Sequence, residues 1–242
     1  SSILGEDMDT FGCLSGFIAE TRSSQSITAQ RKDFVQGRFD LCAACIGIEP
    51  DGINEVGQDH VFMVDVDGSF AGDQIDLSGT EVTVAFASEF GADVLPDATC
   101  LTDAAGMCGV TVNSSNPGRI TATASATVNI HGDLFDVETD ATGDNSDPAV
   151  KTYLDARVAI TGTDVNQVGD PHTFTATIEK NLGDGAGWVD AVDADLVELD
   201  STLTNGGGAI ADIDLDASTC DDPSLTDGTC LLVFTSATPG TT

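Results

Sequence analysis

The chain has few basic residues, few aromatic residues and no long apolar run. Only 8 Lys and Arg stand against 41 Asp and Glu, which gives the 242 residues a formal charge of -33. A chain of this charge repels phosphate backbones and anionic lipid surfaces, so we exclude nucleic acid as a partner and polybasic docking on membranes. No stretch reaches about 18 consecutive apolar residues, and residues 1–9 lack the basic and apolar segments of a signal peptide. We therefore expect no membrane insertion and interpret the sequence as a mature chain or a fragment.

The residues that are abundant favour strands. Hydrophobic residues make up 40% of the chain, mostly Val, Ile, Leu and Ala, and 26 Gly interrupt them. Apolar and polar residues alternate in short runs, as in Phe62, Val64 and Val66 and again from Ile120 to Ile130. This alternation is the period of a half-buried strand. Because the chain exceeds the usual single-domain length of roughly 100 to 150 residues, we predict an all-β protein with two domains.

Comparison of the sequence with itself reveals two copies of one module. The segment from Ile53 to Val64 recurs 112 residues later as Val165 to Ala176, with Asn, Val, Gly, His and Phe in register. The run from Cys108 to Gly118 recurs in the same way from Cys230 to Gly240. Several short strands in a module of roughly a hundred residues predict an immunoglobulin-like (Ig-like) β-sandwich.

The module also resembles a known family. The Asn-x-Val-Gly-x-x-His-x-Phe opening, the Gly-Asp-Gly at 183–185 and the closing Ser-x-x-Pro-Gly resemble tandem bacterial Ig-like domains of the invasin and intimin style. The resemblance implies a stalk, an adhesin or a matrix component. The first copy lacks the Gly-Asp-Gly element. We expect an irregular N-terminal arm at 1–43, an Ig-like domain at 44–147 and a second at 148–242.

Two pairs of cysteines occupy equivalent places in the repeat. Cys100 with Cys108, and Cys220 with Cys230, lie just before the strand that leads to the Pro-Gly turn. We expect a disulfide in each pair, which contributes roughly 2 to 3 kcal/mol in the chain-entropy picture. Disulfides persist in oxidising compartments, so we expect a secreted, extracellular protein associated with the cell surface.

Three cysteines remain: Cys13, Cys42 and Cys45. The Cys-Ala-Ala-Cys spacing at 42–45 does not predict a redox site, because a strand rather than a helix is expected at Ile46–Ile48. A zinc site would need a fourth ligand, and the nearest His is His60. We expect Cys13 to bond one of the other two, and the remaining cysteine to be free or to bridge subunits.

No catalytic motif stands out. The sequence has no Gly-x-Ser-x-Gly elbow, His-Glu-x-x-His helix, phosphate-binding glycine loop or dinucleotide fingerprint. His60 and His172 occupy the same repeat position, which favours a shared structural role over two active sites. We therefore expect no enzymatic activity and no cofactor, with calcium as the one candidate ion.

Calcium has a physical case because clustered Asp residues in loops supply the oxygens that it prefers. Neither cluster matches the spacing of an EF-hand, and a solvated acidic surface is the simpler interpretation. The candidate ligands are Asp65, Asp67, Asp73 and Asp76 in the first copy, and Asp184, Asp190, Asp193 and Asp195 in the second. Trp188, the one Trp of the chain, is the candidate platform for a carbohydrate.

Together these features favour a structural role. The leading hypothesis is a non-enzymatic subunit of an extracellular bacterial filament, stalk or biofilm matrix, and the alternative is a cell-surface adhesin or carbohydrate-binding module. The first copy continues past its Pro-Gly turn into a closing strand, whereas the second copy reaches only Thr242. We expect either a truncated piece of a longer repeat protein or self-assembly with identical subunits. In the second case the arm, at Phe11 to Ala19 or Gln25 to Gln30, donates the missing strand.

Overall fold

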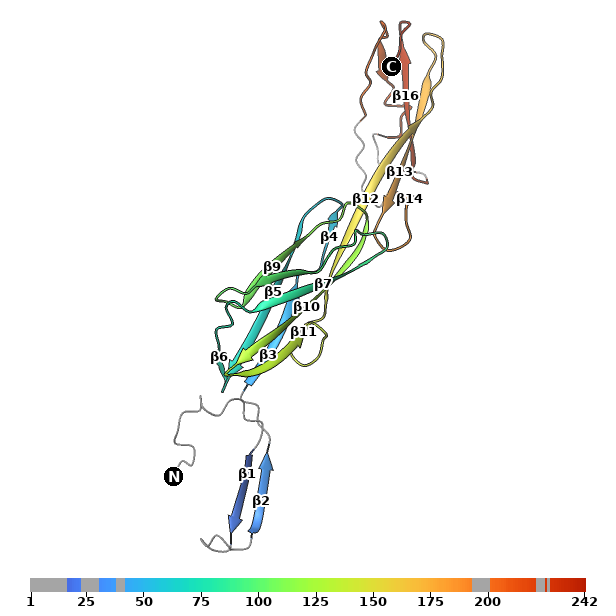
Figure 1. Cartoon of the computed structure of the whole chain (residues 1–242). Helices are drawn as coiled ribbons and strands as arrows, with labels where there is room; N and C mark the ends of the chain where they lie inside the picture. Colours follow the sequence, from blue (N-terminus) through green and yellow to red (C-terminus); the bar gives the residue numbers. More distant parts are fainter. Residues whose placement is uncertain (1–16, 23–30, 38–41, 193–200, 221–224, 226) are drawn as a thin grey trace.

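The computed structural model describes residues 17–22, 31–37, 42–192, 201–220, 225 and 227–242. All regular structure in these residues is β-strand, and no helix occurs among them. The strands form sheets of two, ten and four strands. The predicted all-β class is therefore confirmed. Figure 1 shows an elongated arrangement, with β1 (Phe17–Arg22) and β2 (Arg31–Gly37) at one end and β16 (Thr229–Ser236) at the other.

The first repeat is built from two sheets that share one core. The four-stranded sheet consists of β3 (Cys42–Glu49), β5 (His60–Phe70), β6 (Asp73–Gln74) and β9 (Met107–Val112). The strands of the other sheet that come from this repeat are β4 (Gly52–Glu55), β7 (Glu81–Glu89), β8 (Ala98–Leu101), β10 (Gly118–Ile130) and β11 (Asp133–Glu138). Along β5, β9 and β10, buried side chains alternate with more exposed ones. Both sheets contribute to the buried cluster, for example through Ile46, Phe62, Val64, Val84, Ala124 and Val128.

One strand, β12 (Ala149–Thr161), belongs to both repeats. Its first half pairs antiparallel with β10 and parallel with β4, and its second half pairs antiparallel with β13 (His172–Asn181). The ten-stranded sheet therefore runs without a break from the first repeat into the second. The expected boundary between residues 147 and 148 falls just before this shared strand.

The second repeat adds β14 (Val189–Asp190), β15 (Ala211–Ile213) and β16 to the same sheet. Among the described residues, its buried cluster is smaller than that of the first repeat and consists of Ala176, Ile178, Ala191, Cys220, Leu225, Cys230 and Leu232. The strand register nevertheless repeats. Ile46 lies opposite Val66 where β3 meets β5, and Val158 lies opposite Ile178 where β12 meets β13, each 112 residues later.

The N-terminal arm is not irregular throughout. Strands β1 and β2 pair antiparallel, with Ala19 opposite Val35 and Glu20 opposite Phe34. The prediction of an irregular arm is therefore wrong for residues 17–22 and 31–37. The physical reason lies in residues such as Ile18 and Val35, whose branched side chains favour strands.

The Gly-Asp-Gly element lies at the junction of the two repeats. A Cβ atom on Gly183 would lie 2.5 Å from the carbonyl oxygen of Tyr153 and 2.8 Å from that of Gly118. The φ of Gly183 is also +67°, in the left-handed region that favours glycine. This element thus lets the backbone of the second repeat pack directly on the backbone of the first.

Candidate functional site

The Asn-x-Val-Gly-x-x-His motif forms the same turn in both repeats. In the first, Nδ2 of Asn54 donates a hydrogen bond to the carbonyl oxygen of Asp59 at 3.2 Å. In the second, Nδ2 of Asn166 donates to the carbonyl oxygen of Pro171 at 2.7 Å. The sequence repeat is therefore also a repeat of hydrogen bonds.

A second bond fixes this turn to the end of a neighbouring strand. The N–H of Gly57 donates to the carbonyl oxygen of Ser114, just after β9, at 2.7 Å. The N–H of Gly169 donates to the carbonyl oxygen of Ser236, at the end of β16, at 2.9 Å. We call the space beside these two joined segments the terminal groove of each repeat.

The recurrent histidines pack inside this groove. The ring of His60 meets Phe62 edge-on at 4.7 Å, and the ring of His172 meets Phe174 edge-on at 4.9 Å. Nε2 of His60 also lies 3.1 Å from the carbonyl oxygen of Pro50. These contacts give both histidines a packing role in the described structure.

In the first repeat, the shared strand β12 fills the terminal groove. Tyr153 is fully buried there, and its hydroxyl donates a hydrogen bond to the carbonyl oxygen of Val112 at 3.1 Å. The N–H of Val56 in turn donates to the carbonyl oxygen of Leu154 at 2.9 Å. Tyr153 is not among the candidate residues that the sequence predicts, because its contribution to the first repeat depends on a pairing that crosses the expected domain boundary.

A basic side chain enters the groove beside the tyrosine. Lys151 is 1% exposed, and a Cβ atom on Gly52 would lie 2.9 Å from its Nζ, so the glycine leaves room for the ammonium group. Burial lowers the pKa of Lys151. Burial, followed by the charge of Lys151, lowers the pKa of His60. Burial raises the pKa of Tyr153 to about 12, with a smaller contribution from Asp59.

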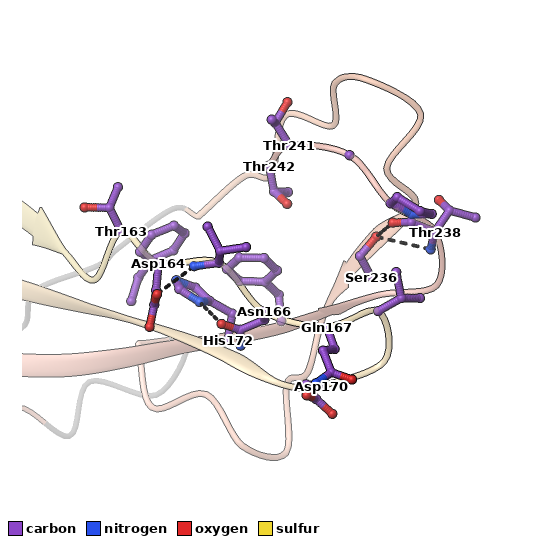
Figure 2. A pocket seen from close by; sticks show the side chains of 16 residues that line it. Thr163, Asp164, Asn166, Gln167, Asp170, His172, Ser236, Thr238, Thr241 and Thr242 are labelled. Carbon is purple, nitrogen blue, oxygen red and sulfur yellow. Dashed lines mark hydrogen bonds between the residues drawn. The ribbon is translucent and has the colours of Figure 1, made fainter.

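In the second repeat, the equivalent groove is a cavity of about 280 Å³. Residues 164–167 take the place of β4, and no strand in the described part of the chain pairs with them. The rings of His172, Phe174 and Phe234 line the cavity, with centroids 4.9 to 5.2 Å apart. Figure 2 shows Asp164 and His172 on one side of this cavity.

The inner face next to this cavity is also less covered than in the first repeat. Val158 is 56% exposed, whereas its counterpart Ile46 is 1% exposed. Ile160 is 63% exposed, whereas its counterpart Ile48 is 6% exposed. The β10–β11 hairpin packs over β3 in the first repeat, and among the described residues no equivalent covers the second half of β12.

The strand edge differs in the same way. In the first repeat, the N–H of Ile46 donates to Oδ1 of Asn145 and the N–H of Ile48 donates to Oγ of Ser146, both at 3.1 Å. These bonds cover the edge of β3 that faces away from β5. Within the part of the chain that the structure describes, residues 155–161 of β12 pair with β13 alone. Among its described residues, the second repeat therefore presents both a strand edge without a partner strand and an aromatic cavity.

The cysteines of the two repeats are paired as expected. Cys100 bonds Cys108 and Cys220 bonds Cys230. Cys42 is also disulfide-bonded, whereas Cys45 is free. Burial, followed by the charges of nearby Asp side chains, raises the pKa of the Cys45 thiol, so the thiolate is disfavoured.

Cys13 lies outside the described residues.

The candidate calcium ligands that the structure describes are not gathered into one metal site. Among the residues that the structure describes, no group of three or more His, Cys, Asp or Glu is placed to hold a metal ion. This result covers Asp65, Asp67, Asp73, Asp76, Asp184 and Asp190. Asp193 and Asp195 lie outside the described residues.

Trp188 is a poor open platform for a sugar. The guanidinium carbon of Arg157 lies 4.2 Å from the centroid of its ring, a distance typical of a cation–π contact. Nε of Arg157 is held in turn by Oε2 of Glu179 at 2.8 Å. One face of the ring is therefore covered, which gives the carbohydrate alternative less support.

Comparison with known proteins adds no family: neither protein-family models nor curated proteins match this chain. In the described residues, no helix is long and apolar enough to span a membrane. The geometry of the groove is therefore what informs function.

Proposed function

We propose that this chain is a non-enzymatic structural component of an extracellular bacterial filament, stalk or biofilm matrix, built from tandem Ig-like modules. The shared strand β12 carries the proposal. Because its first half fills the groove of the first repeat and its second half pairs with β13, both repeats hold the same strand. A pulling force on one repeat therefore passes to the other through a hydrogen-bonded sheet.

Three further features support the extracellular and structural parts of the proposal. The disulfides of the two repeats fit an oxidising compartment. The charge of -33 opposes non-specific association and keeps the chain soluble. The contacts of the recurrent histidines support an architectural role better than a catalytic one.

The location can be tested on cells of the organism that makes the protein. Immunogold labelling with an antibody against the chain should place gold on extracellular filaments, stalks or matrix. Gold confined to the cytoplasm would overturn the proposal.

The mechanical part of the proposal can be tested by X-ray scattering in solution. Inserting Gly-Gly-Ser after Leu154 interrupts the shared strand, and it should broaden the distribution of distances between the two repeats. The same insertion after Ala104, in an exposed turn of the first repeat, is the matched control and should leave the distribution narrow. If the unmodified chain is as broad as the Leu154 variant, then the shared strand does not couple the repeats.

A further inference from the structure

The first repeat shows what the cavity of the second repeat would bind. Its own groove holds an extended strand that runs parallel to β4 and carries Lys151 and, two residues later, Tyr153. The cavity of the second repeat has the same turn, the same His-Phe pair and a further aromatic ring, Phe234. An extended segment with a basic residue two positions before an aromatic one therefore fits it.

The chain contains one other segment of this kind. A Lys or Arg two positions before a Phe, Tyr or Trp occurs at only two places in the 242 residues, Lys151 with Tyr153 and Lys32 with Phe34. The likeness continues along the strand. Lys-Asp-Phe-Val-Gln-Gly-Arg at 32–38 matches Lys-Thr-Tyr-Leu-Asp-Ala-Arg at 151–157 in its basic, aromatic, aliphatic and small residues. Residues 32–37 of this segment lie in β2.

The strand that accompanies β2 also has a counterpart. In the first repeat, β12 pairs antiparallel with the preceding strand β10, with Tyr153 opposite Gly118. In the arm, β2 pairs antiparallel with the preceding strand β1, with Phe34 opposite Glu20. The β1–β2 hairpin shares no sheet with any other described strand. The hairpin thus supplies a counterpart of β12 in β2 and a counterpart of β10 in β1.

Charge favours the same match. Residues 17–38 hold four of the 8 Lys and Arg but only two of the 41 Asp and Glu, so this segment is cationic on an otherwise anionic chain. In the second repeat, Asp164 stands where Gly52 makes room for Lys151 in the first. A lysine that enters the cavity would therefore meet a carboxylate, and a buried or partly buried pair of opposite charges is strengthened by the low local dielectric.

We propose that the β1–β2 hairpin of one copy of this chain occupies the cavity at the end of the second repeat of another copy. Phe34 enters among the rings of His172, Phe174 and Phe234, and Lys32 pairs with Asp164. The hairpin and the cavity lie at opposite ends of the molecule (Figure 1), so the contact joins two different surfaces and extends head to tail without closing. The inference rests on the proposed structural function and names the contact by which the subunits assemble.

The test measures association of the full, oxidised chain by sedimentation velocity over a concentration series. The wild-type chain should form head-to-tail oligomers, and Phe34→Ala should weaken the association by about thirtyfold or more, which is typical of losing a central aromatic anchor. Phe39→Ala is the matched control, since this aromatic residue of the arm has no Lys or Arg two positions before it. It should associate like the wild type.

A mixing experiment identifies the two partners of the contact. Phe34→Ala keeps an intact cavity, and Asp164→Lys, a change at an exposed residue, keeps an intact hairpin. At a concentration where the wild type associates, each variant should be monomeric alone, whereas a mixture should form one-to-one dimers that grow no further. Dimers that fail to form, or a wild-type chain that stays monomeric up to its solubility limit, would overturn this contact. An extracellular location in the labelling experiment would then leave the structural function standing.

Discussion

Replacing Tyr153 with Phe tests how firmly the shared strand fills the first groove. The change removes one oxygen from a fully buried ring and with it the 3.1 Å hydrogen bond to the carbonyl oxygen of Val112. A buried hydrogen bond of this kind contributes roughly 1 kcal/mol net. At pH 8 we therefore expect Tyr153→Phe to lower the free energy of unfolding by about 1 kcal/mol.

The pH dependence of this difference has a definite sign. Burial raises the pKa of Tyr153 from 10.0 to about 12, so the folded chain holds the phenol proton more tightly than the unfolded chain does. The resulting contribution is complete below pH 10 and is lost as the pH rises through 12. About 1.4 kcal/mol is lost by pH 11, since one pKa unit corresponds to about 1.4 kcal/mol. The difference in free energy of unfolding between the wild type and Tyr153→Phe should therefore vanish or change sign by pH 11.

Urea unfolding followed by circular dichroism at pH 8 and pH 11 measures both values. Because the pKa of Lys151 is lowered in the folded chain, this lysine increases the free energy of unfolding as the pH rises toward 10.5. The Tyr153→Phe variant keeps the same lysine, so this contribution largely cancels in the difference between the two proteins. A difference between wild type and variant that stays the same at the two pH values would refute the burial argument for Tyr153.

Three further outcomes are expected. Replacing both Cys220 and Cys230 by Ser should lower the free energy of unfolding of the second repeat by about 2 to 3 kcal/mol, as expected for a short closed loop, measured by urea titration of the oxidised proteins; an unchanged midpoint would contradict it. Gly183→Ala places a Cβ against the carbonyl oxygens of Tyr153 and Gly118, so it should cost about 1 to 3 kcal/mol and loosen the junction, which thermal melting and solution scattering will show together. Added NaCl and added CaCl₂ should raise the melting temperature of the protein by the same amount at equal ionic strength, because screening of the like charges alone accounts for the rise. A larger rise in CaCl₂ would instead reveal specific calcium sites.

The alignment of the two repeats could be predicted from the sequence, but the burial of their residues could not. Val158 and Ile160 match Ile46 and Ile48 in position and in hydrophobic character, and the register of their strands is the same. Their exposure differs because burial depends on what lies across the sheet, which the residues of one strand do not encode. A period-two pattern shows which side chains share a face, not whether that face is covered.

The double role of β12 was hidden for a related reason. The expected boundary between residues 147 and 148 assigns residues 149–154 wholly to the second copy. These residues pair with β10 and β4 of the first copy. The sequence of either copy taken alone does not predict this pairing. The signal that could have revealed this pairing is Tyr153, an aromatic residue of the kind found in cores. It lies two positions after Lys151 and ahead of the first residues that repeat. The same spacing of Lys32 and Phe34 then predicts a second strand that fits a terminal groove.

In the proposed assembly, the acidic surface limits which strands can approach the open end of the second repeat. An open strand edge flanked by the exposed Val158 and Ile160 invites pairing with any unpaired strand. Paired strands lie about 4.8 Å apart, whereas repulsion between like charges acts over about 8 Å at physiological ionic strength. Two acidic bodies therefore repel each other before their edges can pair. The segment at 17–38 escapes this repulsion because its cations outnumber its acids, so the charge that discourages random association leaves the hairpin free to approach.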